Sequence, residues 1–207
     1  GQLQDRLGDL NDLADARSTF DRRALKPDEI VDGESIDPHS GTARYWSRMR
    51  LDEQATHGVR IFALQRKLPD PMTYKNAKPN AVSGLDHVVI NTSNPERATA
   101  LYGARLGLRL ALDRSNPDWD MRLMFFRVGQ LTIELAHKIS AGVGNAPDKL
   151  WGLSWRVPDI DAAHERLVAA NFAVTSIRAG RRAGTKVFTV RDGTLNVPTL
   201  VLSAEPA

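Results

Sequence analysis

The chain has 207 residues, 28 basic and 25 acidic side chains, and no cysteine. Such a length suits one large domain or two small ones, and the interspersed charges do not indicate a nucleic-acid surface. The lack of cysteine excludes disulfides, cysteine-ligated zinc and thiol catalysis. No apolar run is long enough for a membrane span and no signal-peptide core begins the chain, so we expect a cytoplasmic protein.

The N-terminal segment predicts one helix followed by two strands. Asp12 is a typical N-cap for a helix that Pro27 ends. Residues 33–41 are rich in turn formers, which predicts a turn region. Residues 42–51 and 59–65 are rich in aromatic and β-branched side chains, as expected for strands.

A second segment follows a proline-rich stretch at residues 69–82, which we interpret as a linker. Residues 85–92 predict a strand, Asn94 is a candidate N-cap, and Gly107 is a candidate C-terminal glycine of the helix. Three further strands are predicted, the last two as a hairpin, at residues 108–113, 121–128 and 131–136.

The remainder of the chain repeats this order. Residues 152–157 predict a strand, Asp159 caps a helix, and three strands follow at residues 173–178, 186–191 and 197–203. The helix start at Asn94 aligns with the one at Asp159, so each unit predicts a strand, a helix and three strands. Units of this kind pair to bury a shared face.

Two side chains stand out because they interrupt apolar strands. His87 lies early in one strand and Glu134 lies inside another. A buried carboxylate requires a partner, and His with Glu on neighbouring strands is half of a divalent-metal site. Glu134 facing a cavity could also act as a general base. The alternatives are a histidine that bonds a backbone carbonyl, and an ion pair of Glu134 with Arg122 or Arg127.

Four stretches of the chain resemble the vicinal-oxygen-chelate superfamily, which includes glyoxalase I, bleomycin- and fosfomycin-resistance proteins and type I extradiol dioxygenases. They are Leu85-Asp86-His87-Val88-Val89-Ile90, residues 101–108, Ile133-Glu134-Leu135 and residues 155–163. The resemblance implies an α+β fold in which paired βαβββ modules form cup-shaped, mostly antiparallel sheets. It implies an N-terminal module at residues 1–68, the linker at 69–82, and a C-terminal pair at 83–207, divided into 83–138 and 150–207.

In that superfamily, metal ligands come from the first and last strands of paired modules. The resemblance therefore places His87 and Glu134 on two ligand positions for Mn²⁺, Fe²⁺, Ni²⁺ or Zn²⁺, and makes Glu134 a candidate catalytic residue. The second module departs from the pattern, because Gly152 or Leu153 and Leu200 or Val201 occupy its ligand positions. Extradiol dioxygenase activity and a complete glyoxalase site within residues 83–207 are therefore not expected.

A further metal ligand would have to come from elsewhere. We expect Asp5 or Gln2 of the N-terminal module, or a second chain in a homodimer, to provide it. Three modules are also an odd number for an architecture that pairs them, so we expect a further N-terminal module beyond this sequence.

Ser154, Trp155, Arg156 and Phe126 are the candidates for substrate binding in the cup. Arg156 could anchor a carboxylate or phosphate, or form a salt bridge at the rim. Aromatic side chains in strands are more often core residues than ligand contacts. We interpret the basic cluster of Arg178, Arg181, Arg182 and Lys186 as a solvated loop.

The sequence leaves two functions open. One is a metal-dependent lyase or isomerase that acts on vicinal oxygens of a small molecule, for which the metal would be a Lewis acid. The other is a metal-free protein of the bleomycin-resistance kind, which sequesters an apolar or aromatic molecule. Neither involves a nucleic acid or a membrane.

Overall fold

The computed structural model describes residues 12–67, 78 and 80–203, and it confirms an α+β fold. The described residues of the N-terminal unit form one helix and a three-stranded antiparallel sheet in the order β1-β2-β3. Its elements are α2 (Leu13–Arg22), β1 (Val31–Ile36), β2 (Ala43–Arg50) and β3 (Phe62–Lys67).

All remaining strands of the described residues belong to one eight-stranded sheet in the order β5-β6-β7-β4-β8-β11-β10-β9. Its first half contains β4 (Gly84–Asn91), α3 (Pro95–Thr99), a π-helical turn (Ala100–Arg105), β5 (Arg109–Asn116), β6 (Met121–Val128) and β7 (Leu131–Lys138). Its second half contains β8 (Lys149–Val157), α4 (Ile160–Ala169), β9 (Arg178–Ala179), β10 (Lys186–Val190) and β11 (Thr199–Ser203).

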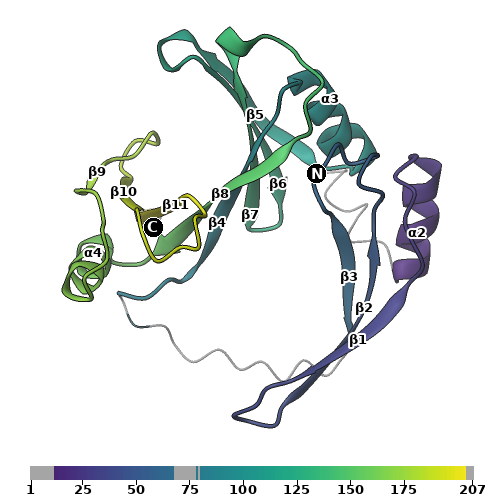
Figure 1. Cartoon of the computed structure of the whole chain (residues 1–207), viewed down its shortest axis with the longest axis horizontal. Coiled ribbons are helices and arrows are strands. Elements are labelled where there is room, and N and C mark those ends of the chain that lie inside the picture. Colours follow the sequence, from purple (N-terminus) through teal and green to yellow (C-terminus); the bar gives the residue numbers. More distant parts are fainter. Residues whose placement is uncertain (1–11, 68–77, 79, 204–207) are drawn as a thin grey trace.

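The two halves of this sheet are arranged in the same way. The first strand of each half pairs in parallel with the last, β4 with β7 and β8 with β11. The halves meet where β4 pairs antiparallel with β8 at the middle of the sheet. The helices α3 and α4 lie towards opposite ends of the sheet (Figure 1).

Both helices pack on the same face of the sheet, which leaves the other face free for a cup. Ile90, Leu135 and Phe126 join the core beneath α3, and Val157 and Phe188 join the core beneath α4. Side chains alternate between the faces of a strand, so the neighbours of these core residues face the opposite side. A third, smaller cluster of Val89, Leu123 and Ala136 lies there.

The helix starts follow the sequence closely. The side chains of Asp12, Asn94 and Asp159 each accept a hydrogen bond from the backbone N–H three residues on, as N-caps do. No helix in the described part of the chain is long and apolar enough to cross a membrane.

Two local predictions are confirmed only in part. A turn region is expected at residues 33–41, and Gly41 N–H does donate to the Asp37 carbonyl in a turn. Gly33, however, lies within β1, where the Trp46 indole packs so closely that a Cβ at position 33 would lie 2.6 Å from it. A strand is expected at residues 173–178, but their pairing is reduced to a single bridge between Val174 and Val190 before the short β9. The expected linker at residues 69–82 lies largely outside the described residues.

The N-terminal unit and the first half of the larger sheet share one hydrophobic core. Leu13 and Phe20 of α2 belong to the same buried cluster as Leu101 and Tyr102 of the π-helical turn, and the two helical segments lie side by side in Figure 1. Arg105, at the end of this turn, donates hydrogen bonds to the carbonyl oxygens of three residues of the N-terminal unit: Arg23, Ala24 and Ala55. One guanidinium therefore satisfies three acceptors across the junction.

Replacing Arg105 with Ala should lower the free energy of unfolding by about 2–3 kcal/mol, because two partly buried carbonyl groups and one exposed carbonyl group lose a charged donor. Chemical denaturation measures this change. Arg109→Ala removes an exposed arginine at the start of β5 and is the control, with an expected change within about 0.5 kcal/mol. Equal effects of the two substitutions would show that the junction does not depend on Arg105.

Candidate functional site

The pairing of β4 with its two neighbours brings three polar side chains together on the helix-free face. His87 lies opposite Ser154 of β8, and Val89 lies opposite Glu134 of β7. The Nε2 atom of His87 lies 2.7 Å from Ser154 Oγ and 3.4 Å from Glu134 Oε2. The structure thus places the predicted metal pair, His87 and Glu134, side by side.

A β-bulge in β4 positions the imidazole of His87. The pairing with β8 shifts register between Leu85 and His87, so Asp86 does not alternate to the opposite face as in a regular strand. Asp86 Oδ1 lies 2.7 Å from His87 Nδ1, and Asp86 Oδ2 accepts a hydrogen bond from Arg156 Nε at 3.0 Å. The hydrogen bond with His87 holds the pKa of Asp86 below its ordinary range, and Arg156 adds to this.

This carboxylate fixes which imidazole nitrogen carries the proton. An ionised carboxylate only accepts hydrogen bonds, so Nδ1 of His87 donates to Asp86. In the neutral imidazole, Nε2 is then an acceptor and takes a hydrogen bond from the Ser154 hydroxyl. The lone pair of Nε2 consequently points towards the same region as the carboxylate of Glu134.

Glu134 is buried in a largely apolar setting. Val89, Leu123 and Ala136 form a buried cluster on the same face, with Met121 and Phe125 packed against it. Burial raises the pKa of Glu134, while the charges of His87 and Arg181 act in the opposite direction. The site therefore combines an apolar floor with a carboxyl group that gives up its proton reluctantly.

Arginine and tryptophan from the two edges of the sheet meet above this floor. Arg181, in the loop after edge strand β9, places its Nη1 3.9 Å from Glu134 Oε1. The guanidinium carbon of Arg181 lies 4.7 Å from the ring centroid of Trp119, which is in the turn after edge strand β5. Arg114 of β5 approaches that ring too, at 5.7 Å. The sheet therefore curves until the segments that follow its two edge strands are in contact, as the expected cup requires.

Of the four predicted substrate-binding residues, one lies in the cup and one supports His87. Ser154 lies in the cup beside His87. Arg156 is committed to Asp86 and to the backbone carbonyls of Leu85 and Gln130, so it supports His87 instead of facing a ligand.

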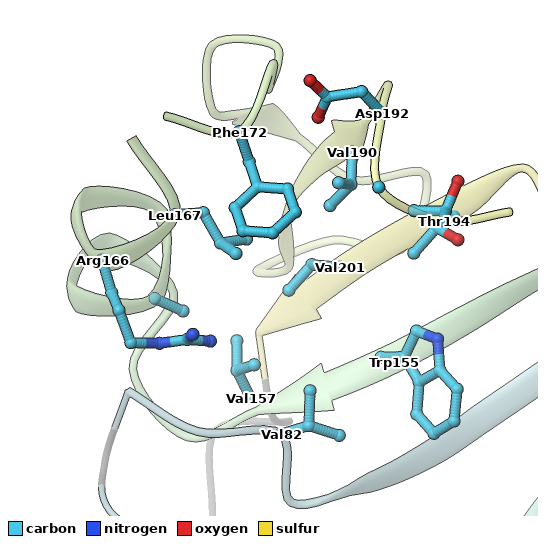
Figure 2. Close-up of a pocket in the computed structure, with 13 residues that line it drawn as sticks. Val82, Trp155, Val157, Arg166, Leu167, Phe172, Val190, Asp192, Thr194 and Val201 are labelled. Carbon is cyan, nitrogen blue, oxygen red and sulfur yellow. The ribbon is translucent and has the colours of Figure 1, made fainter. Parts of the chain in front are cut away.

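The two aromatic predictions need correction, because both side chains lie on the helix-covered face. Phe126 is fully buried in the core beneath α3, with its ring 6.0 Å from that of Tyr102. Trp155 lines an apolar pocket of about 410 Å³ between α4 and the sheet, where Phe172, Leu167 and Val201 surround the cavity (Figure 2). Strand alternation separates Trp155 from its neighbour Ser154 in the cup.

The alternative partners proposed for Glu134 are engaged elsewhere. Arg122 pairs with Asp113 and Glu96, and Arg127 donates to the Thr132 hydroxyl. Glu134 instead faces His87 and Arg181.

The second half of the sheet provides no equivalent ligand pair. Gly152 lies opposite Val89, and Leu200 lies opposite Ser154. Within the part of the chain that the structure describes, no group of three or more His, Cys, Asp or Glu side chains could hold a metal ion. The candidate ligands Asp5 and Gln2 lie outside the described residues.

Two site residues escape prediction from the sequence. Asp86 adjoins His87, and strand alternation would place it on the far face; only the bulge brings it to the imidazole. Arg181 belongs to the basic cluster that the sequence indicates as a solvated loop, although its guanidinium lies over the cup. The basic cluster is a visible signal, but its position over Glu134 depends on the curvature of the whole sheet.

Comparison with protein-family models decides the classification. The model of the glyoxalase/bleomycin resistance protein/dioxygenase superfamily matches residues 86–189, which is half of the chain. The chain belongs to this superfamily. The match begins one residue before His87 and includes Glu134, Ser154 and Arg181, so all four lie within the superfamily region. A search of curated proteins gives no match.

Solved structures share the superfamily fold at low sequence identity. Methylmalonyl-CoA epimerase from Mycobacterium tuberculosis is 24% identical, with a TM-score of 0.51 over 60% of this chain and 90% of the epimerase. A hypothetical protein from Bacillus halodurans is 16% identical, with a TM-score of 0.52 over 60% of this chain and 96% of that protein. A variant of Streptomyces coelicolor methylmalonyl-CoA epimerase in complex with 2-nitronate-propionyl-CoA is 13% identical, with a TM-score of 0.51 over 61% of this chain and 100% of that chain. At these identities the likeness shows the fold.

The raised pKa of Glu134 predicts a pH-dependent effect of Glu134→Gln. A carboxyl group whose pKa is higher in the folded state binds its proton more tightly there, so it favours folding below its ordinary pKa of 4.5. This contribution is lost as the pH rises through the folded-state pKa. Relative to wild type, Glu134→Gln should therefore gain stability between acidic and neutral pH.

Denaturation at several pH values, with EDTA present throughout, measures this difference. Glu165→Gln, which makes the same change at an exposed glutamate on α4, is the control for the loss of a surface carboxylate. A flat profile for Glu134→Gln would mean that folding does not disfavour the ionised carboxylate.

Proposed function

We propose that this superfamily member is a divalent-metal-dependent enzyme that acts on vicinal oxygens of a small molecule, as a lyase or isomerase. His87 and Glu134 would be its protein ligands. The observation that carries this proposal is the 3.4 Å separation of His87 Nε2 and Glu134 Oε2. Both atoms are acceptors once Glu134 is ionised, so a cation or a proton between them is required to make their approach favourable.

The residues present fit a divalent ion as a partial ligand set. Two donor atoms 3.4 Å apart can share one ion at about 2.0–2.2 Å from each. The Asp86 carboxylate on Nδ1 of His87 is the outer partner that metal-binding histidines usually have. With two protein ligands, several coordination positions would stay open for substrate oxygens, and an ion there would supply Lewis-acid polarisation of those oxygens.

The protein's own groups would prepare this site for substrate. Asp86 keeps the lone pair of His87 directed into the cup, and Arg156 holds Asp86 in turn. The apolar floor beneath Glu134 excludes water, which strengthens every charge interaction above it. The Ser154 hydroxyl, which donates to Nε2 across 2.7 Å, would be released once an ion took up the Nε2 lone pair, and it could then donate to a substrate oxygen bound beside His87.

A second candidate is metal-free binding of a small molecule in the cup, in the manner of the bleomycin-resistance proteins. Gly152 and Leu200 at the remaining ligand positions favour it, and so does the Arg181 guanidinium beside Glu134, because a bound cation would be repelled there. The two candidates make opposite predictions about added metal.

Under the first proposal, adding Mn²⁺, Ni²⁺ or Zn²⁺ to EDTA-treated protein should raise its melting temperature. An ion at a hundred times its Kd would add about 2.7 kcal/mol of stability. His87→Ala and Glu134→Gln should each abolish the shift, because one ligand or its charge is lost. His39→Ala, an exposed histidine in the β1–β2 turn, should leave it intact.

Absence of any metal-dependent shift in the wild type would refute the metalloenzyme and leave the binding protein. A shift that persists in both His87→Ala and Glu134→Gln would place the metal elsewhere.

Asp86→Asn should weaken metal binding by about ten- to a hundredfold without altering a ligand, because the imidazole loses the carboxylate that orients it. Isothermal titration with Ni²⁺ measures the change. Asp161→Asn, on the exposed side of α4, is the control. Unchanged affinity in Asp86→Asn would remove Asp86 from the proposed site.

A further inference from the structure

Arg181 occupies an unusual position for a residue in a surface loop. It reaches over the cup from the β9 edge of the sheet, and its Nη1 lies 3.9 Å from Glu134 Oε1. This ion pair is long, and 59% of the Arg181 side chain is exposed. The guanidinium is thus close to the proposed reaction centre and still accessible from solvent.

The loop that carries Arg181 is tightly hydrogen-bonded. Gly180 N–H donates to the Thr185 carbonyl, and the Thr185 backbone N–H and hydroxyl both donate to the Arg182 carbonyl. A Cβ at position 180 would lie 2.2 Å from Thr185 Oγ1, so any larger residue there would displace the Thr185 hydroxyl. Such a turn fixes the base of the Arg181 side chain over the cup.

A second arginine contributes positive charge to the same place. Arg114 lies on β5 opposite Leu123, which puts it on the cup face. The guanidinium carbons of Arg114 and Arg181 lie 5.7 and 4.7 Å from the Trp119 ring, which is itself 43% exposed. Two cations thus gather around one exposed aromatic ring at the entrance to the cup.

We propose that Arg181 is a specificity-determining residue that binds the anionic group of the substrate, so that the cup takes a small carboxylate or phosphate carrying an adjacent oxygen and an apolar body. The inference rests on the proposed function, because it assigns the substrate class of the same site. The apolar floor of Val89, Leu123 and Phe125 accommodates the apolar part of the substrate. The planar guanidinium of Arg181 can donate two parallel hydrogen bonds to its carboxylate or phosphate. Arg156, the anchor expected from the sequence, is occupied by Asp86.

Binding of matched probes tests this assignment. We would titrate wild-type protein, without metal and again with Mn²⁺, with 3-phenyllactate, its neutral amide 3-phenyllactamide, and phenyl phosphate. Phenyllactate should bind at least about tenfold more tightly than the amide, because a charged hydrogen bond to the guanidinium is lost in the amide. Comparison with phenyl phosphate identifies which anion the site prefers.

Arg181→Gln should weaken anion binding about tenfold or more and remove the preference for the acid over the amide. Arg181→Lys keeps the positive charge but loses the planar pair of hydrogen-bond donors, so it should retain part of the preference for the acid over the amide. Arg17→Gln removes an equal charge from the exposed side of α2, away from the cup, and should behave as wild type. Circular dichroism of each variant confirms that the fold is kept.

Equal binding of acid and amide, no effect of Arg181→Gln, or no binding of either anion up to millimolar concentration would overturn the inference. The metal titration separates this outcome from failure of the proposed function. A Mn²⁺-dependent melting shift without any Arg181 effect refutes the anion anchor alone. Arg181-dependent anion binding without a metal shift refutes the metalloenzyme alone.

Discussion

The antiparallel pairing of β4 with β8 is the constraint on which the rest of the structure depends. It joins the two halves of the larger sheet, and it sets His87 opposite Ser154. The parallel pairing of β4 with β7 then fixes Glu134 beside them. Because side-chain period in a strand is two, a slip of one residue in either pairing would move a polar group from the cup into the core beneath the helices. Register therefore determines the chemistry of the site.

Local signals in the sequence are sufficient for most of the fold. The caps at Asn94 and Asp159 and the β6–β7 hairpin lie where propensity and spacing predict them. The strand β1 escapes prediction because its polar residues and Gly33 resemble a turn, and only the pairing with β2 makes it extended. At residues 173–178 a strand is predicted but only a single bridge forms there before β9. Their apolar pattern favours a strand, but it does not by itself provide a full pairing partner.

The candidate site is less predictable, because it depends on contacts between distant strands. Glu134 is visible as a carboxylate within an apolar strand, and His87 as its counterpart. Trp155 and Phe126 lie outside the cup, contrary to prediction, because aromatic residues satisfy either face of a strand, and composition does not say which face is covered. The position of Arg181 over the cup depends on the curvature that brings the segments after β9 and β5 together. No local sequence pattern encodes that curvature.

The bulge at Asp86 has a consequence for motion within the sheet. Glu134 and Ser154 belong to strands on either side of β4, so their distances to His87 change whenever the sheet flexes or its strands separate. Asp86 and His87 are covalent neighbours, and the 2.7 Å contact between them travels with β4 as a unit. Flexing of the sheet would consequently widen and narrow the space around His87 Nε2, while the imidazole keeps its tautomer and its orientation relative to β4.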